Sequence, residues 1–247
     1  MKQLIIFDLD GTLAESKSPI DSDIAQLLNI LLINFKVGII SGGSWQQFEK
    51  QVLPKLSKGE SLKNLLLLPT CGTKFYQYKS NWELCYSEDF SLSEKTSIIH
   101  AINETLVAIG FKTEKVWGPI IEDRGSQITF SALGQQAPLQ EKIKWDKDGS
   151  KRRKIKAHLE TLIPAFAVCL GGTTSIDVTQ VGINKAYGIR KLQEIVNVPI
   201  EDMIFVGDSL FEGGNDFPAK STGIACIEVE NINETKLAIK TIIACLS

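Results

Sequence analysis

The stretch that decides the fold is QLIIFDLDGTL, residues 3–13, close to the start of the chain. An unbroken apolar run is followed at once by Asp8 and Asp10, and then by a glycine and a threonine. Such a run is typical of a strand buried on both faces of a parallel sheet. Because ligands of open α/β sheets bind at the carboxyl ends of the strands, two aspartates at this position indicate a functional site.

Strand and helix patterns alternate on either side of a different central region. After residues 3–10, helices are expected at 21–35 and 44–56, and strands at 36–43 and 64–70. The same alternation returns near the C-terminus, with helices at 184–196 and 233–246 and strands at 202–209 and 223–229. This βαβαβ order predicts a doubly wound, Rossmann-like parallel sheet with right-handed crossovers.

The central region has an α+β pattern. Aromatic and polar residues alternate in the expected strands 74–78 and 82–87, and further strands are expected at 127–133, 165–172 and 174–180. Helices are expected at 91–110, which opens with a capping box, and at 151–162. The sequence therefore predicts an α/β core formed by residues 1–80 and 182–247. An inserted α+β cap domain with an antiparallel sheet is expected at 81–181.

Composition limits the partners of the protein. The chain has 247 residues and a net charge of −2, which gives no electrostatic case for binding nucleic acid. Its apolar stretches are too short to span a bilayer, and its start does not resemble a signal peptide. We expect a cytoplasmic protein without nucleic-acid or membrane partners. Five widely spaced cysteines and two histidines offer little for a cysteine or histidine metal site.

Polar residues follow the expected core strands and should meet at one edge of the sheet. They are Asp8, Asp10, Ser41, Gly42, Gly43, Lys185, Asp208, Asn215 and Asp216. Three carboxylates at one edge repel one another unless a cation binds, and an all-oxygen set fits Mg²⁺. A lysine, a hydroxyl and glycine N–H groups add a phosphate cradle. Together they indicate phosphoryl transfer through an aspartyl-phosphate.

Four of these motifs resemble those of the haloacid dehalogenase (HAD) superfamily. They are FDLDGTL (7–13), IISGG (39–43), Lys185 and VGDSLFEGGND (206–216). A cap inserted after the third core strand is similar to that of the type-IIB branch. Within that branch, GGTTSIDV (171–178) and the total length resemble the eukaryotic phosphomannomutases.

The resemblance implies a role for each aspartate. Asp8 is expected to be the nucleophile that takes the phosphoryl group. Asp10 is expected to be the general acid/base. The expected Mg²⁺ ligands are the side chains of Asp8 and Asp208 and the backbone carbonyl of Asp10.

Further residues are expected to bind the substrate or support the site. Ser41 and Lys185 should hold the phosphoryl oxygens, with Gly42 and Gly43 beside them. Asn215 and Asp216 should orient Lys185 and the metal-bound waters.

The cap domain differs from the phosphomannomutase pattern at phosphate-binding positions. Arg124 is kept, but Trp117 and Gln135 stand where that family has arginine, and Lys17 replaces another arginine near the first motif. Arginine suits bidentate phosphate binding, so these changes weaken the expected grip on a second phosphate. The residues that match the sugar-contacting pair of that family are Ser175 and Asp177.

Each lost charged hydrogen bond is worth roughly 1.5–3 kcal/mol, and a phosphatase needs no second grip. The sequence therefore favours a Mg²⁺-dependent phosphatase acting on a phosphorylated sugar or a similar small metabolite. The alternative is a phosphomannomutase that interconverts mannose 1-phosphate and mannose 6-phosphate. A non-catalytic sugar-phosphate-binding protein is a third hypothesis, which the intact motif aspartates do not favour. A homodimer formed through the cap domain is left open.

Overall fold

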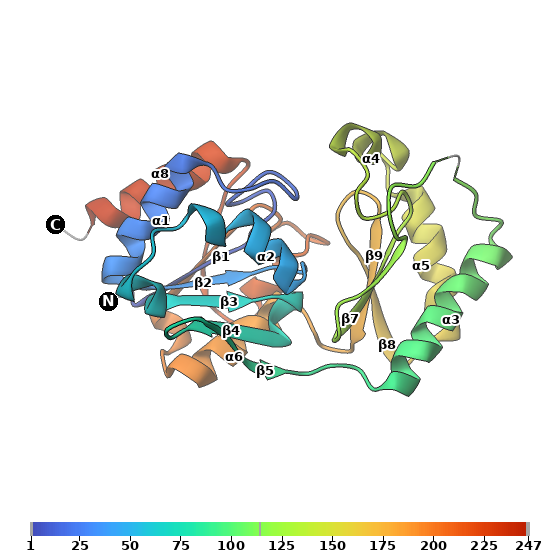
Figure 1. Ribbon diagram of the computed structural model, residues 1–247, viewed down its shortest axis with the longest axis horizontal. Coiled ribbons are helices and arrows are strands. Elements are labelled where there is room, and N and C mark those ends of the chain that lie inside the picture. The colour runs from blue at the N-terminus through green and yellow to red at the C-terminus, as the bar shows by residue number, and fades with distance from the viewer. Residues whose placement is uncertain (1, 114, 246–247) are drawn as a thin grey trace. The chain divides into compact units, whose positions relative to one another are not determined.

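The computed structural model describes residues 2–113 and 115–245 (Figure 1). These residues divide into two compact units. The core unit consists of the chain up to Ser87 together with the chain from Asn184 onward, and the cap domain is Glu88–Ile183. Within the described residues, no helix is both long enough and apolar enough to cross a membrane.

The core unit is built on a seven-stranded sheet with the order β11-β10-β1-β2-β3-β4-β5. The five strands from β11 to β3 are parallel, and β4 and β5 are added antiparallel at one edge. The strands are β1 (Leu4–Phe7), β2 (Lys36–Ile40), β3 (Leu65–Leu68), β4 (Lys74–Tyr78), β5 (Trp82–Ser87), β10 (Met203–Gly207) and β11 (Ala225–Glu228). The helices are α1 (Ser22–Asn34), α2 (Trp45–Gln51), α6 (Lys185–Val196), α7 (Phe217–Lys220) and α8 (Ile232–Ala244). The predicted fold class, a doubly wound core with a separate antiparallel sheet, is confirmed.

Both faces of β1 are buried, which explains its continuous apolar run. Ile5 and Phe7 face a cluster that includes residues of α1, α2 and α8. Leu4 and Ile6 face a second cluster that includes residues of α6 and α7. Because successive side chains of a strand point to opposite faces, every position of β1 must be apolar. Polar residues can appear only where the strand ends.

Two glycines allow α6 to approach the core backbone closely. Gly188 lies on α6, and Gly72 lies in the turn Thr70–Gly72 that follows β3. A Cβ atom built on Gly72 would lie 2.6 Å from the Cα of Gly188, closer than atoms can pack. Only glycine therefore fits where this turn meets α6.

The cap domain has a four-stranded antiparallel sheet of order β6-β7-β9-β8, with helices packed on one of its faces. Its strands are β6 (Ile121–Asp123), β7 (Gln127–Ser131), β8 (Phe166–Leu170) and β9 (Ser175–Gln180). Its helices are α3 (Leu92–Ala108), α4 (Leu139–Trp145) and α5 (Ser150–Leu162). The expected capping box at the start of α3 is present, whereas β6, α4 and the core helix α7 were not expected.

The division between the units lies later in the chain than the sequence suggested. We expected the cap domain to begin at residue 81, but β5 pairs with β4 from Tyr78↔Trp82 to Lys74↔Ser87 and extends the core sheet. The aromatic residues explain this placement, since Trp45 of α2 stacks on Tyr76 with ring centroids 3.8 Å apart and also contacts Trp82. The alternating pattern of residues 74–87 therefore belongs to the core and not to the insertion.

Asp146 holds the start of α5 in the cap domain. Its buried carboxylate accepts hydrogen bonds from the backbone N–H groups of Lys151 at 2.9 Å and Arg152 at 3.1 Å, and pairs with the Arg152 guanidinium at 2.8 Å. Arg152 also donates to the carbonyl of Gly171 at 2.9 Å, at the turn between β8 and β9. Burial alone would raise the pKa of Asp146, but the Arg152 guanidinium and the two N–H groups hold it below its usual value.

We expect Asp146→Ala to lower the free energy of unfolding by about 3 kcal/mol, because the half-buried Arg152 guanidinium loses its carboxylate partner and two backbone N–H groups lose their acceptor. The lowered pKa means that the contribution of Asp146 is complete above the unfolded value of 3.8 and is lost as the pH falls through the folded value. The difference in thermal stability between wild type and Asp146→Ala should therefore be smaller at pH 3 than at pH 7. Glu160→Ala, which removes an exposed ion pair with Lys156, is the control, and an equal loss there would contradict the prediction.

Candidate active site

Two aspartates follow neighbouring parallel strands at the same edge of the core sheet. β1 ends at Phe7 and β10 ends at Gly207, so Asp8 and Asp208 come next on adjacent strands. The hydroxyl of Thr12 donates to Oδ1 of Asp208 at 3.2 Å. One carboxylate oxygen from each of Asp8, Asp208 and Asp216 lies within 4.8 Å of the other two. We call these three residues the carboxylate cluster.

Lys185 bridges two members of the carboxylate cluster. It is the first residue of α6, and only 1% of its surface is exposed. Its Nζ donates to Oδ1 of Asp8 and, at 2.6 Å, to Oδ1 of Asp216. The other oxygen of Asp216 accepts the backbone N–H of Ser209 at 3.1 Å. Both carboxylate oxygens of Asp216 therefore accept a hydrogen bond, and the residue is fully buried.

Burial and mutual repulsion raise the pKa values of two members of the carboxylate cluster, Asp8 and Asp208. Burial raises the pKa of Asp8 to about 8, with Lys185 opposing the rise and the other two carboxylates adding to it. Burial also raises the pKa of Asp208, and the negative charge of Asp216 adds to that rise. Burial would lower the pKa of Lys185, but Asp216 and Asp8 outweigh it and raise the pKa above its usual value. One lysine is therefore not enough to keep all three carboxyl groups ionised at their usual pKa values.

The loop after β2 lies beside the loop after β3. The hydroxyl of Ser41 is buried and accepts the backbone N–H of Gly43 at 3.0 Å. The carbonyls of Ser41 and Gly43 accept backbone N–H groups of Cys71 and Thr70 at 2.9 and 3.0 Å. Gly42 lies between them. This pairing fixes the backbone of the predicted phosphate loop.

The carboxylate of Asp10 lies in different surroundings. Its Oδ1 accepts the backbone N–H of Lys17 at 2.7 Å and Nε2 of Gln51 at 3.2 Å. Its Oδ2 accepts Nε2 of Gln47 at 2.5 Å. Its carboxylate thus contacts the loop that follows β1 and the helix α2, and it is not part of the carboxylate cluster. Asn215, the remaining core residue expected at the site, is exposed in the loop before Asp216.

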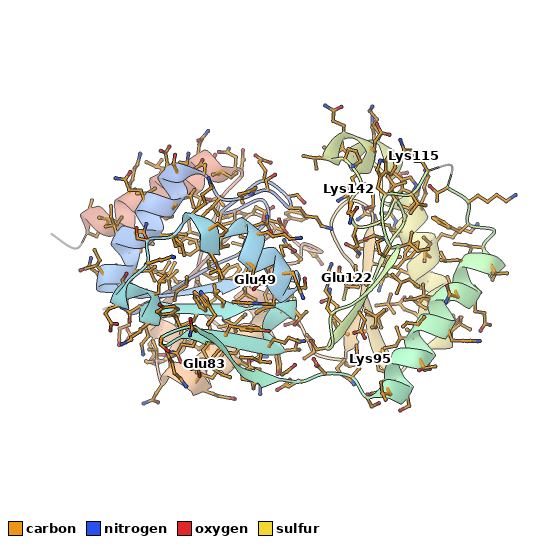
Figure 2. The ribbon with its side chains drawn as sticks, viewed as in Figure 1. Glu49, Glu83, Lys95, Lys115, Glu122 and Lys142 are labelled. Atoms are coloured by element: carbon orange, nitrogen blue, oxygen red, sulfur yellow. The ribbon has the colours of Figure 1, made fainter. Side chains whose placement is uncertain are left out.

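Arg124 in the cap domain is held by a neighbouring acid. Its Nε and NH2 groups donate to one carboxylate oxygen of Glu122 at 2.9 and 2.7 Å, and its side chain is 8% exposed. Figure 2 labels Glu122 on β6. Trp117, which stands where the mutase pattern has arginine, packs under the ammonium of Lys115 at 4.8 Å from its ring centroid.

One face of the cap sheet carries a ladder of polar side chains. The hydroxyls of Ser131 and Ser175 lie 2.9 Å apart, and Thr129 donates to Asp177 at 2.7 Å across the same pair of strands. Nε2 of Gln135 donates to the Ser131 hydroxyl at 3.0 Å. The predicted substrate residues Ser175 and Asp177 therefore share this face of β9.

The family model described as haloacid dehalogenase-like hydrolase matches residues 5–218. The chain belongs to this haloacid dehalogenase-like family. The predicted superfamily is therefore confirmed.

Sequence relatives of this HAD-family chain carry the name phosphomannomutase. The phosphomannomutase of Encephalitozoon cuniculi is 24% identical over 237 residues, which cover 87% of this chain and 83% of the relative. Human phosphomannomutase 1 is 27% identical over 229 residues, which cover 87% of this chain and 81% of the relative. These relatives support the mutase alternative better than the phosphatase that the sequence led us to prefer.

Similar solved structures show the fold. The IMP-bound, N-terminally truncated IMP-nucleotidase of Plasmodium falciparum has a TM-score of 0.73 and 18% identity, covering 98% of this chain and 68% of that one. A trehalose-6-phosphate phosphatase related protein has a TM-score of 0.59 and 16% identity, covering 98% of both chains. In both cases the likeness covers the core unit and the cap domain of this chain.

The carboxylate cluster has the donor set of a hard divalent cation. Oδ2 of Asp8 is buried and has no hydrogen-bond partner among the residues that the structure describes. Three carboxyl groups share one ammonium, so ionising all three would leave an excess of negative charge. Oxygen ligands with excess negative charge fit Mg²⁺, which would also satisfy the unpaired oxygen of Asp8.

Two residues that contact Asp10 were not expected from the sequence. Gln47 and Gln51 lie one helical turn apart on α2, and Gln51 is buried. The sequence holds only a weak sign of these contacts. Gln47 and Gln51 are spaced one helical turn apart, next to the apolar residues Phe48 and Val52. A buried amide on such a face needs a polar partner, and the partner here is the predicted acid/base.

We expect Lys185→Met to lower the free energy of unfolding by about 3–5 kcal/mol near neutral pH, because buried carboxylates lose their cation. A carboxyl whose folded pKa exceeds its unfolded value loses stability as the pH rises, and the pKa of Asp8, already about 8, should rise further without the lysine. Urea unfolding should therefore show a difference from wild type that grows as the pH rises above about 8. Arg190→Met, on an exposed position of the same helix, is the control. Unchanged stability of Lys185→Met at every pH would contradict the assigned role.

Proposed function

We propose that this chain transfers a phosphoryl group between a sugar phosphate and Asp8, and that its overall reaction is that of a phosphomannomutase. The observation that carries the transfer chemistry is Asp8, a buried carboxylate with one oxygen held by Lys185 and the other without a partner in the described residues. The mutase outcome is supported by the printed names of the sequence relatives. The inferred substrate class is a phosphorylated hexose.

The proposed reaction has two balanced half-reactions. In the first, an oxygen of Asp8 bonds to phosphorus while the bond from phosphorus to the sugar oxygen breaks, and Asp10 gives that oxygen a proton. In the second, Asp10 takes a proton from an incoming hydroxyl, whose oxygen bonds to phosphorus as the bond to Asp8 breaks. Both aspartates return to their starting states.

The neighbouring residues bind the phosphoryl group in this proposal. Lys185 offsets the negative charge on the transferring oxygens, and the Ser41–Gly43 loop offers the hydroxyl of Ser41 as a donor. Asp8, Asp208 and the backbone carbonyl of Asp10 would hold Mg²⁺, which would supply further positive charge to the phosphoryl group. Asp216 keeps Lys185 in place through their ion pair of 2.6 Å.

The cap domain supplies the sugar-binding groups in this proposal. Ser175 and Asp177 offer a hydroxyl and a carboxylate on one face of β9, which suits the hydroxyls of a hexose. Arg124 provides a guanidinium that can bind the phosphate that is not reacting, although Glu122 competes for it.

A phosphatase is the second candidate, and a specific observation favours it. Gln135 stands where the mutase pattern has arginine, and its amide donates to the Ser131 hydroxyl. An uncharged amide binds a phosphate more weakly than a guanidinium does. If the second phosphate is held too weakly, water replaces the sugar hydroxyl in the second half-reaction and free phosphate is released.

The first test of this function is Asp8→Asn, which keeps the shape of the side chain but removes the nucleophile. We expect more than a thousandfold loss of turnover with mannose 1-phosphate and Mg²⁺, because no aspartyl-phosphate can form. Mass spectrometry of the acid-quenched wild type should detect a phosphorylated peptide containing Asp8, and excess EDTA should abolish it. A wild type that binds sugar phosphates without turnover or phosphorylation would instead be a binding protein.

The second test separates mutase from phosphatase by the ratio of mannose 6-phosphate to free phosphate. We expect the wild type, primed with glucose 1,6-bisphosphate, to form mainly mannose 6-phosphate from mannose 1-phosphate. The double variant Trp117→Arg, Gln135→Arg should raise the ratio further, because each guanidinium adds a charged donor for the second phosphate. A wild type that releases phosphate, responds little to bisphosphate and becomes a mutase in the double variant would establish the phosphatase instead.

A further inference from the structure

The amide of Gln51 has a fixed orientation. Its Nε2 donates to the backbone carbonyl of Ser18 at 2.6 Å, and a carbonyl can only accept. The NH₂ end of the amide must therefore face Ser18, and the same nitrogen reaches Oδ1 of Asp10. Because only 2% of Gln51 is exposed, water does not compete for these contacts.

This placement of Gln51 leaves a polar atom unsatisfied. Oε1 of Gln51 is buried and has no hydrogen-bond partner among the described residues. An unpaired buried acceptor costs stability, so packing alone does not account for a glutamine here. A leucine or methionine would fill a similar volume without that cost.

Gln47 approaches the other oxygen of Asp10 from the preceding turn of α2. Residues four apart lie on one face of a helix, so the two amides point the same way. The Gln47 amide lies against Gly43, where any side chain would collide with it. With the N–H of Lys17, the two amides surround the Asp10 carboxylate with donors on both oxygens.

We propose that Gln47 and Gln51 are positioning residues that hold the Asp10 carboxylate in the orientation from which it serves the oxygen entering or leaving phosphorus. The inference rests on the proposed function, since it concerns Asp10 as acid/base. The Ser41–Gly43 loop runs directly into α2 through Ser44. The loop that binds the phosphoryl group and the amides that hold Asp10 therefore belong to one short rigid segment.

A purely structural role for Gln51 makes a different prediction. The side chain of Gln51 donates to the Ser18 carbonyl at 2.6 Å, so it also ties the loop after β1 to α2. Loss of such a tie would slow every substrate alike. Loss of a positioning residue slows only the steps in which Asp10 moves a proton.

The test uses the full-length Mg²⁺-loaded protein and two phosphoryl donors. With mannose 1-phosphate, whose leaving oxygen needs a proton, Gln51→Met and Gln47→Met should each lower kcat by about 10-fold to 100-fold, with KM changed less than about threefold. With 4-nitrophenyl phosphate, whose leaving group departs without a proton, the single-turnover release of nitrophenolate should change less than about threefold. Gln46→Met, at an exposed position of α2, should match the wild type with both donors.

A double-mutant cycle supplies the second readout. In an Asp10→Ala background, Gln51→Met and Gln47→Met should cost nothing further with mannose 1-phosphate, because the residue through which they act is gone. Calorimetric Mg²⁺ binding and the melting temperature report whether each variant is intact. If Gln51→Met does not fold, Gln47→Met carries the test, since it is partly exposed and its side chain reaches Asp10 directly.

The outcomes separate the two levels of inference. Equal losses with both donors, or further losses in the Asp10→Ala background, would show a structural role and overturn the positioning role while the proposed function stands. Variants that behave like wild type in every assay would overturn it as well. A wild type that transfers no phosphoryl group from either donor would overturn the proposed function, and the positioning role with it.

Discussion

The contact of Lys185 with Asp8 and Asp216 is the interaction on which the core depends. Lys185 and Asp8 are 177 positions apart in the chain, on either side of the whole cap domain. Lys185 and Asp216 are 31 positions apart, both in the last third of the chain. Burying three charged groups is costly unless they pair well, so the core is stable only when all three segments are in place. The same ammonium that lets the carboxylates be buried is the group proposed to meet the phosphoryl oxygens. Stability and chemistry thus depend on one side chain.

Much of this site follows from elementary rules applied to the sequence. Parallel strands bring their carboxyl ends to one edge, which is why Asp8 and Asp208 could be expected together although they are 200 positions apart in the chain. The rule fails for side chains whose partners depend on tertiary packing. Nothing local distinguishes Gln51 from an ordinary polar residue on a helix, because its partner Asp10 is 41 positions away. The burial that gives it meaning appears only in the folded chain.

Two other expectations show where sequence patterns mislead. The alternation in residues 82–87 was the correct signature of a strand, but periodicity does not say which sheet a strand joins, and aromatic packing placed β5 in the core. The preference for a phosphatase came from Trp117 and Gln135, that is, from two charges that are absent. An absent charge indicates lost affinity only if no other group replaces it, and a sequence does not show which groups reach the same phosphate. The names of the relatives favour the mutase instead.

The contact between Gly72 and Gly188 has a consequence for the electrostatics of the site. Lys185 and Gly188 lie on the same turn of α6, so the depth of that helix in the core sets the reach of the ammonium. Charge interactions weaken with separation, and water that entered a widened gap would weaken them further. Because neither Gly72 nor Gly188 has a side chain, α6 can approach closely enough to keep Lys185 near the carboxylates. The alignment of the active site is encoded partly in positions that carry no functional group at all, where even a conservative change to alanine would alter the chemistry.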